Sequence, residues 1–422
     1  MKKIKRLTAL ILTVIMVFSM FTILPITVNA ADKVYSLSIL DDGTAEITGY
    51  TGNIANLVIQ SKIYGYKITG IGAYAFRDCS FLKTVTIPNS VTIISNNAFY
   101  YCDNLTTVTV PNSVKSIGKC AFAGCDKLKA MIIPNSVTSI GDSAFKYCYS
   151  LTAITIPDSV TSIGNSAFEY CNSLATLKIS ASVKNIGEDV FKYCNRLSTI
   201  TVDEKNQKYD SRNNCNAIIE TKTNTLLYGS LNTVIPDSVT HIGNNAFYSF
   251  KDLKTITIPE SVTSIGNGAF FSCENLTTLT IPNSVKSIGD YAFQYCQALK
   301  TITIPESVTS IGDSVFWGCD ALTAYVYKDS YAHKYVDDNN IRYVIIETQP
   351  EVVLGDVNFD GKINVLDATA IQKYSVGQSD FDDNALASAD ANKDGTVNIM
   401  DSTLIQKYAV GLVSEFWWKY LK

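Results

Sequence analysis

Histidine is scarce in this chain, which holds only two such residues among 422. This shortage argues against histidine-rich metal centres and catalytic triads, because both depend on imidazole groups. Charge is sparse as well: 18% of the residues are charged and the formal net charge is −4. The chain therefore lacks the basic surface that nucleic-acid binding requires. Hydrophobic residues make up 46% of the chain, which is typical of a folded protein rather than a disordered one.

The first 31 residues have the layout of a secretory signal peptide. Positions 2–6 carry four basic residues, residues 7–24 are apolar, and residues 28–31 include small side chains suited to cleavage. We expect cleavage there and an exported mature chain. The apolar run is also long enough to span a bilayer if it were retained, so an uncleaved anchor is the alternative.

A 23-residue period dominates the middle of the chain. Phenylalanine marks its ten copies, at Phe76, Phe99, Phe122, Phe145, Phe168, Phe191, Phe247, Phe270, Phe293 and Phe316. Each copy alone buries too little apolar surface, so neighbouring copies must stack to form a continuous core. The period and its Leu-x-x-Ile-x-Ile core predict a leucine-rich-repeat solenoid of short parallel strands and short helical turns.

One copy illustrates the expected unit. Leu151, Ile154 and Ile156 face inward from a short strand, and a helical turn then buries Phe168. Asn165 is suited to cap that turn. Most other copies carry Asn or Asp in the same slot, at Asn96, Asp142, Asn244, Asn267, Asp290 and Asp313.

These repeats resemble the bacterial surface-protein, or BspA-like, type of leucine-rich repeat, with its Ile-Gly-x-x-Ala-Phe-x-x-Cys signature. The resemblance covers residues 61–325. It implies a β-hairpin insertion near residues 197–235, where the period breaks and the solenoid can bend. It also implies an N-terminal cap at residues 32–60 and a C-terminal cap at residues 326–346.

Nine of the eleven cysteines occupy one slot per repeat. The irregular copy has Phe250 in that slot, so the slot faces the core, where free cysteine behaves as a small hydrophobe. A disulfide could span neighbouring rungs about 5 Å apart, but each thiol would have two equivalent neighbours. We therefore expect a reduced, buried ladder, with Cys120 and Cys215 off the ladder and exposed. The sequence has no Cys-x-x-Cys pair, which argues against a cysteine metal site.

The outward strand positions are rich in threonine, as at Thr84, Thr86, Thr107 and Thr109. Threonine favours strands, so sheet formation alone can explain it. The functional alternative is a broad, weakly polar surface that binds a protein or polysaccharide ligand. Neither His241, at an outward repeat position, nor His333, in the C-terminal cap, has an evident nucleophile partner, so we predict that the chain is not an enzyme.

Two twelve-residue loops near the C-terminus carry the spacing of calcium ligands. Calcium takes oxygen ligands from loop positions 1, 3, 5, 7, 9 and 12, with glycine at position 6. The predicted ligands are Asp356, Asn358, Asp360, the Lys362 carbonyl, Asn364 and Asp367 in the first loop, and Asp390, Asn392, Asp394, the Thr396 carbonyl, Asn398 and Asp401 in the second. Two matching loops predict two calcium ions.

A near-identical helix follows each loop, at residues 367–377 and 401–411, and none precedes it. This duplication resembles a type I dockerin, the module that docks proteins onto the cohesins of scaffoldins in cellulosomes. The resemblance assigns residues 354–422 to a small all-α dockerin domain and residues 347–353 to a linker. It implies a cohesin partner contacted by Val365, Leu366, Gln372, Lys373, Ile399, Met400, Gln406 and Lys407. The near-identical halves also allow two docking orientations.

Two features of the dockerin-like region leave its partner open. The better-known dockerin pattern has Ser-Thr at loop positions 10 and 11, where this chain has apolar pairs, so the sequence does not identify the cohesin. The aromatic tail at residues 416–420 is expected to pack against the start of the same module near residues 350–354. The alternative is that the tail forms a second binding surface.

The sequence as a whole predicts a secreted, non-catalytic binding or adhesion component of a bacterial cell-surface complex. Its dockerin would join it, through calcium, to a cellulosome-type assembly that degrades polysaccharides. Two alternatives stay open: a docked glycoside hydrolase or peptidase with an unrecognised site, and a free cell-surface adhesin. No nucleic-acid partner is expected, and no membrane contact after signal cleavage.

Overall fold

The computed structural model describes residues 34–346 and 353–413. The predicted signal segment, nearly all of the predicted linker and the aromatic tail at residues 416–420 lie outside these ranges. The chain divides into two compact units, Met1–Val344 and Ile345–Lys422, and each is described by itself. Within the described ranges, none of the helices has the length and apolar character needed to cross a membrane.

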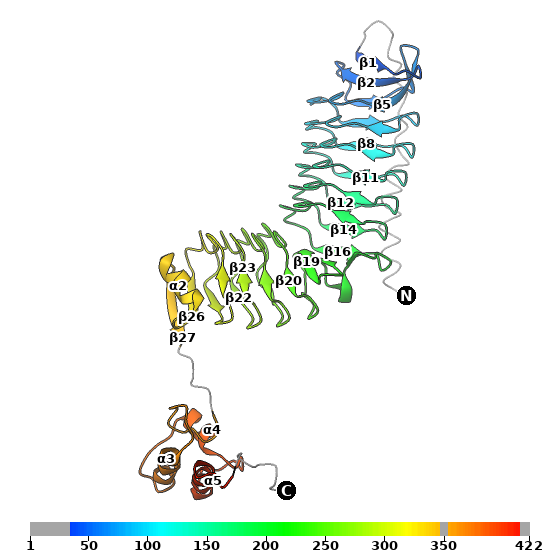
Figure 1. The fold of residues 1–422 in the computed structure, drawn as a ribbon. Helices are drawn as coiled ribbons and strands as arrows, with labels where there is room; N and C mark the ends of the chain where they lie inside the picture. Colours follow the sequence, from blue (N-terminus) through cyan, green and yellow to red (C-terminus); the bar gives the residue numbers. More distant parts are fainter. Residues whose placement is uncertain (1–33, 347–352, 414–422) are drawn as a thin grey trace, which may run out of the picture. The chain divides into compact units, whose positions relative to one another are not determined.

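The first unit is a stack of rungs in which each regular copy of the 23-residue period supplies strands to two parallel sheets (Figure 1). In the N-terminal run of rungs, one sheet contains β3 (Asn56–Val58), β6 (Thr84–Thr86), β8 (Thr107–Thr109), β10 (Ala130–Ile132), β12 (Ala153–Thr155), β14 (Thr176–Ile179) and β16 (Thr199–Val202). The other contains the two-residue strands β7 (Ile93–Ile94), β9 (Ser116–Ile117), β11 (Ser139–Ile140), β13 (Ser162–Ile163) and β15 (Asn185–Ile186). Strands pair in register with the equivalent residue of the next copy, as Ile154 does with Leu177.

The core of the solenoid is a column of parallel rings. On each side of the irregular segment, the phenylalanines that mark the period stack face to face, with Phe145 and Phe168 centroids 5.3 Å apart at an interplanar angle of 1°. The ladder cysteines line the same interior, and their thiols donate to a carbonyl of the preceding rung, as Cys171 does to Phe145 at 3.2 Å. All eleven cysteines are free. The ladder cysteines are buried, as the repeat predicted, and the reduced state of their thiols stays a prediction.

The predicted helix cap at Asn165 is wrong. Ser166 follows it with a φ of 54°, a left-handed conformation that cannot begin a right-handed helix, and the segment is a run of tight turns. The Asn165 side chain instead accepts from the backbone amide of Glu188 in the next rung at 2.9 Å. In-register stacking places each of these positions beside the equivalent position of the next rung, so the side chain links neighbouring rungs by a hydrogen bond.

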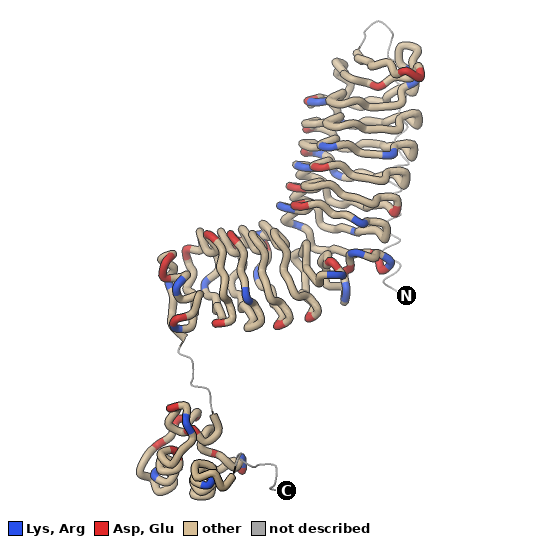
Figure 2. Tube along the Cα trace, in the orientation of Figure 1, with Lys and Arg blue, Asp and Glu red and all other residues tan. Residues whose placement is uncertain are grey.

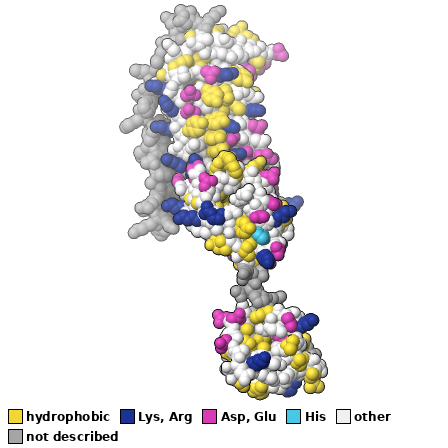
Figure 3. Space-filling model, turned by 90° about the vertical axis from the view of Figure 1, so that its left-hand side faces the viewer, with side chains coloured by type: hydrophobic (Ala, Val, Ile, Leu, Met, Phe, Trp, Pro, Cys, Tyr) yellow, Lys and Arg dark blue, Asp and Glu magenta, His cyan; other side chains and the backbone are white. Residues whose placement is uncertain are grey.

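The surface of the rungs carries aromatic and charged side chains in adjacent positions. Tyr170 stacks on Tyr193 with ring centroids 4.0 Å apart, and Tyr147 lies 5.0 Å from Tyr170. Figure 3 shows hydrophobic side chains gathered in a band along one face of the rungs. Acidic and basic residues alternate along the turns without forming a large field of one sign (Figure 2).

The irregular segment forms an antiparallel hairpin that interrupts both sheets. It contains β17 (Tyr209–Asp210), the short helix η1 (Arg212–Asn214), β18 (Ile218–Glu220) and β19 (Thr225–Tyr228). β19 then pairs in parallel with β20 (His241–Ile242), and the same sheet continues through β21 (Ser264–Ile265), β23 (Ser287–Ile288) and β25 (Ser310–Ile311). Within this unit the stack changes direction at the hairpin (Figure 1).

One cysteine prediction was wrong in this hairpin. Cys215 is 1% exposed because the hairpin folds onto the last rung before it and buries this turn. Its thiol lies within reach of the Ala217 carbonyl. Cys120, the other off-ladder cysteine, is half-buried rather than fully exposed.

Elements outside the regular period close both ends of the stack. At the N-terminal end, β1 (Tyr35–Ile39) and β2 (Ala45–Tyr50) form a hairpin that pairs with β5 (Tyr66–Ile71), and β4 (Lys62–Ile63) also pairs with β5. At the C-terminal end, the sheet formed by β22 (Thr278–Thr280), β24 (Thr301–Ile304) and β26 (Thr323–Tyr327) ends on β27 (Tyr343–Ile346). The helix α2 (Tyr331–Asp338) lies between the last two strands in sequence, and it buries Ala332 and Val336.

The second unit contains the helices α3 (Val365–Ser375), α4 (Asp383–Ala389) and α5 (Ile399–Ala409). Its core is small and consists of Val357, Ala368, Ile371, Ala385, Ala389, Ala391 and Ile405. The Ser402 hydroxyl on α5 donates to the Ala368 carbonyl on α3 at 3.0 Å, so a buried hydrogen bond joins the two long helices. The unit thus has its own core, separate from that of the solenoid.

Candidate calcium loops and docking surface

The first candidate calcium loop is held by side chains that accept hydrogen bonds from the loop's own backbone. Asp356 accepts from the Gly361 amide at 2.9 Å and from the Asp360 amide at 3.2 Å. Asp360 in turn accepts from the Lys362 amide at 2.9 Å. Gly361 has a φ of 76°, which favours glycine and lets the chain turn back sharply. The loop is therefore closed around the aspartates at its first and fifth positions.

Asp367, at the last loop position, ties the loop to the helix that follows. It is fully buried. One carboxylate oxygen accepts from the Val357 amide at 3.0 Å and the other from the Asn364 amide at 2.9 Å. The second of these bonds belongs to a capping box with Asn364 at the start of α3. The helix therefore begins two residues before the predicted start, and the ligand aspartate lies in its first turn.

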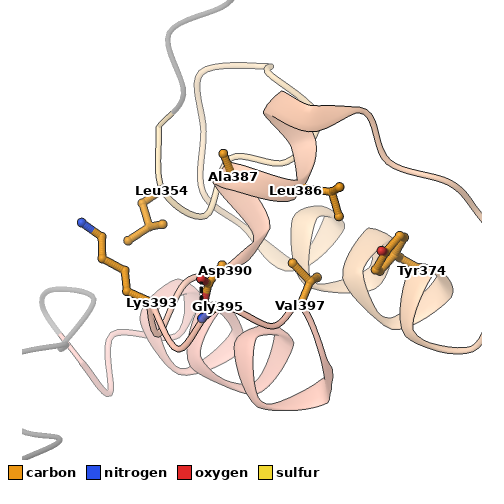
Figure 4. A pocket seen from close by; sticks show the side chains of 8 residues that line it. All are labelled: Leu354, Tyr374, Leu386, Ala387, Asp390, Lys393, Gly395 and Val397. Atoms are coloured by element: carbon orange, nitrogen blue, oxygen red, sulfur yellow. Dashed lines mark hydrogen bonds between the residues drawn. The ribbon is translucent and has the colours of Figure 1, made fainter.

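The second loop repeats this arrangement almost bond for bond. Asp390 accepts from the Gly395 amide at 2.9 Å, a bond drawn in Figure 4. Asp401 is fully buried and accepts from the Asn392 amide at 3.1 Å and the Asn398 amide at 2.9 Å. Asn398 and Asp401 form the capping box of α5. Two loops of the same sequence pattern thus adopt the same geometry.

The donor chemistry of both loops suits a hard cation such as calcium, since every predicted ligand is an oxygen. Burial raises the pKa of the Asp401 carboxyl, and the nearby charges of Asp390 and Asp394 raise it further. A bound cation would offset this repulsion. Across the described residues, however, no three His, Cys, Asp or Glu side chains converge closely enough to hold a metal ion. The loop carboxylates are hydrogen-bonded to backbone amides instead.

A cavity of about 430 Å³ lies beside the second loop (Figure 4). It is lined by Leu354, Tyr374, Leu386, Ala387, Asp390, Lys393, Gly395 and Val397. Leu354 brings the start of the module next to this loop. None of the residues predicted to contact a partner lines the cavity, so it is separate from the predicted docking surface.

The residues predicted to contact a partner lie mainly on the outside of the module. Leu366 is 61% exposed and Met400 is 64% exposed, and Val365 and Ile399 beside them are exposed as well. Lys373, Gln406 and Lys407 are exposed, and Gln372 is half-buried. Two further residues, which were not predicted from the sequence, are exposed at the C-terminal ends of the two helices: Val376 after α3 and Val410 after α5. Each half of the module therefore presents the same apolar set to solvent.

Comparison with known families decides what these two units are. The family described as BspA type leucine rich repeat region (6 copies) matches residues 50–141, 92–219 and 227–336, which together span more than half of the chain. The chain belongs to the BspA-type leucine-rich-repeat family. The dockerin type I domain matches residues 354–409, so the second unit carries a dockerin.

Solved structures of bacterial leucine-rich-repeat proteins have the same fold as the solenoid. A leucine-rich cell surface protein from Faecalibacterium prausnitzii A2-165 is 31% identical over 78% of this chain and 97% of its own, with a TM-score of 0.59. A leucine-rich-repeat protein from Eubacterium ventriosum is 26% identical over 75% of this chain and 84% of its own, with a TM-score of 0.52. The pneumococcal vaccine antigen PcpA shares the fold at 17% identity, covering 74% and 97% of the chains, with a TM-score of 0.58. No curated protein matches the chain.

Neither histidine lies in a catalytic arrangement within the described residues. Nδ1 of His241 lies 2.8 Å from the hydroxyl of Thr240, the residue before β20, but the His241 side chain is exposed. His333 lies in α2, where its Nδ1 accepts from the Asp329 amide at 3.2 Å. Leucine-rich repeats and dockerins are both non-catalytic modules.

Proposed function

We propose that this chain is a secreted, non-catalytic binding component that its dockerin docks onto a scaffoldin cohesin in a cellulosome-type complex. One observation carries the proposal: the module repeats a closed oxygen-rich loop and a helix with an exposed apolar pair. Leu366 and Met400 occupy equivalent places in the two halves. Exposed apolar side chains that recur at equivalent positions on two helices are typical of a protein–protein interface.

Two calcium ions would hold the docking helices in shape. The proposed ligands are those predicted from the sequence, Asp356, Asn358, Asp360, the Lys362 carbonyl, Asn364 and Asp367, with their counterparts in the second loop. Asp367 and Asp401 link metal binding to docking, because each lies in the first turn of a helix that carries the exposed apolar pair. A bound ion would stabilise these first turns by satisfying the buried carboxylates.

The matching halves support docking in two orientations. The N-cap residues Asn364 and Asn398 have nearly the same backbone angles, with φ of −149° and −152° and ψ of −171° in both. Both loops close through nearly the same set of bonds from backbone amides to aspartate carboxylates. A half-turn of the module would therefore present Ile399 and Met400 where Val365 and Leu366 had been.

The pull-down that tests this function uses the full chain as bait and cohesin modules from the same organism as prey. We expect retention in saturating calcium and loss of retention with a chelator. The double variant Asp356→Ala/Asp390→Ala should lose binding, whereas either single variant should retain one docking orientation. Asp158→Ala, which removes an exposed carboxylate from a solenoid turn, is the matched control. If the cohesin is retained equally in the presence of chelator and by the double variant, calcium-dependent docking is refuted.

A free cell-surface adhesin is the second candidate, because the Faecalibacterium protein that shares the fold of the solenoid is a leucine-rich cell surface protein. In that case the calcium loops would only stabilise the module. Failure of the chain to bind any cohesin of its own organism in saturating calcium would favour this candidate.

A further inference from the structure

The last rung of the solenoid and the C-terminal cap line an open cavity of about 580 Å³. Its floor is the end of the hydrophobic core, where Phe316, Cys319 and Leu322 remain buried. Its walls come from Tyr335 on α2 and from the loop that follows the helix. The cavity thus combines an apolar floor with polar walls, and its size lies in the range of small-molecule sites.

Trp317 stands at this cavity with an exposed fraction of 59%. It is held in place from the neighbouring rung, because its ring meets Tyr295 edge to face, with centroids 4.9 Å apart at 71°. Gly318 makes this close packing possible: a Cβ there would meet Cδ1 of Tyr295 at 2.6 Å, and the φ of 77° also favours glycine. An indole fixed at one edge and open to solvent offers a flat platform for a ligand.

The polar groups around the cavity can both donate and accept hydrogen bonds. The Tyr335 hydroxyl accepts from the Val315 amide at 3.1 Å, which leaves its own O–H to donate. Asp320 and Arg342 add an acceptor and a donor of opposite charge, and both are exposed. The side-chain amide of Asn339 donates to the Tyr335 carbonyl at 2.9 Å, so its oxygen can accept. The balance of charge favours a neutral ligand rich in hydroxyl groups.

We propose that this cavity binds a short stretch of a neutral polysaccharide. A sugar ring has C–H groups on its faces and hydroxyls at its edges, so it can stack on Trp317 and hydrogen-bond to the walls at the same time. Vicinal hydroxyls can bridge the Asp320 carboxylate and the Arg342 guanidinium. The biological role of this site rests on the proposed function, because a docked component that binds polysaccharide would hold the assembly on its substrate. The binding itself does not depend on docking.

The test is isothermal titration calorimetry of the full chain with cellotetraose, xylotetraose and mannotetraose, and with tetragalacturonate as the charged comparison. At least one neutral oligosaccharide should bind saturably. Trp317→Ala should weaken that binding at least tenfold, and Asp320→Asn should weaken it several-fold. Tyr149→Ala is the matched control, since Tyr149 is also an exposed aromatic residue but lies outside the cavity. The Tyr149→Ala variant should bind the oligosaccharide with the same affinity as the unchanged chain.

Several results would overturn the proposal. These are no binding of any neutral oligosaccharide, equal affinity in the Trp317→Ala variant, tighter binding of tetragalacturonate than of every neutral probe, or saturable binding of a random dodecapeptide pool at this site instead. The large exposed fraction of Trp317 means that its removal should leave folding intact, which thermal unfolding checks. The two proposals separate cleanly: Asp356→Ala/Asp390→Ala should keep oligosaccharide binding, and Trp317→Ala should keep cohesin binding.

Discussion

Replacing Phe168 with alanine tests how the rungs are coupled. Phe168 is fully buried between two parallel neighbours, with centroids 5.3 Å from Phe145 and 5.7 Å from Phe191. Emptying a buried phenylalanine site costs about 3–5 kcal/mol, and the loss of both stacked contacts places this variant near the upper limit, at about 4–5 kcal/mol. The free energy of unfolding should fall by that amount.

The same substitution at Phe316 is the matched control. Phe316 stacks face to face on one ring, Phe293, at 5.6 Å, and on its other side it meets Tyr335 edge to face at the longer distance of 6.3 Å. One missing stacked pair is worth about 0.5–1.5 kcal/mol, so Phe316→Ala should cost about 3 kcal/mol.

Equilibrium urea unfolding, followed by far-ultraviolet circular dichroism, measures both losses. The two losses can be compared if the slope of the unfolding free energy against urea concentration is the same in both variants and the unchanged chain. A changed slope would indicate unfolding in stages, which repeat arrays can show. Equal losses in the two variants, or a larger loss for Phe316→Ala, would contradict a core in which stability comes from contacts between adjacent rungs.

Two further predictions concern the cysteines and the hairpin. Iodoacetamide should modify all eleven thiols after unfolding. In the native chain Cys120 should react first, because it is half-buried whereas the ladder cysteines are buried. Mass spectrometry that finds fewer than eleven free thiols after unfolding would contradict this. Arg212→Lys should destabilise the hairpin by about 1 kcal/mol, because the guanidinium donates to both carboxylate oxygens of the half-buried Asp210, at 2.8 and 2.6 Å, and a lysine ammonium cannot bind both in this way. Hydrogen exchange of the β17–β19 amides should become faster in this variant. Unchanged protection of these amides would contradict a stabilising role for the pair.

The sequence pattern was sufficient to predict the solenoid and its inward residues. A period of 23 residues places equivalent side chains in register, so one buried position such as Phe168 implies nine others. The same reasoning predicted the burial of the cysteine ladder, because a slot that accepts Phe250 must be apolar. In the second unit, the fixed spacing of Asp356, Gly361 and Asp367 sufficed to place the loop.

Features that depend on contacts between distant residues were harder to predict. Asn165 was expected to cap its own turn, but it binds Glu188 because stacking brings a second copy of the slot close. Cys215 was expected to be exposed, but the hairpin folds back over it. The short helix α4 was not predicted; its capping residue, Asp382, is the one signal that marked it. The cavity at Trp317 also has no sequence signal, since it exists only where the array of rungs ends.

Calcium titration of the full chain by calorimetry is the most direct test of the account, whose central claim is that two ions hold the paired helices ready for docking. We expect two ions per chain, and a rise in the thermal stability of the dockerin unit when calcium is added. One ion should remain in Asp356→Ala or in Asp390→Ala, and none in the double variant. A chain that binds no calcium, with a dockerin unit equally stable in chelator, would contradict the claim.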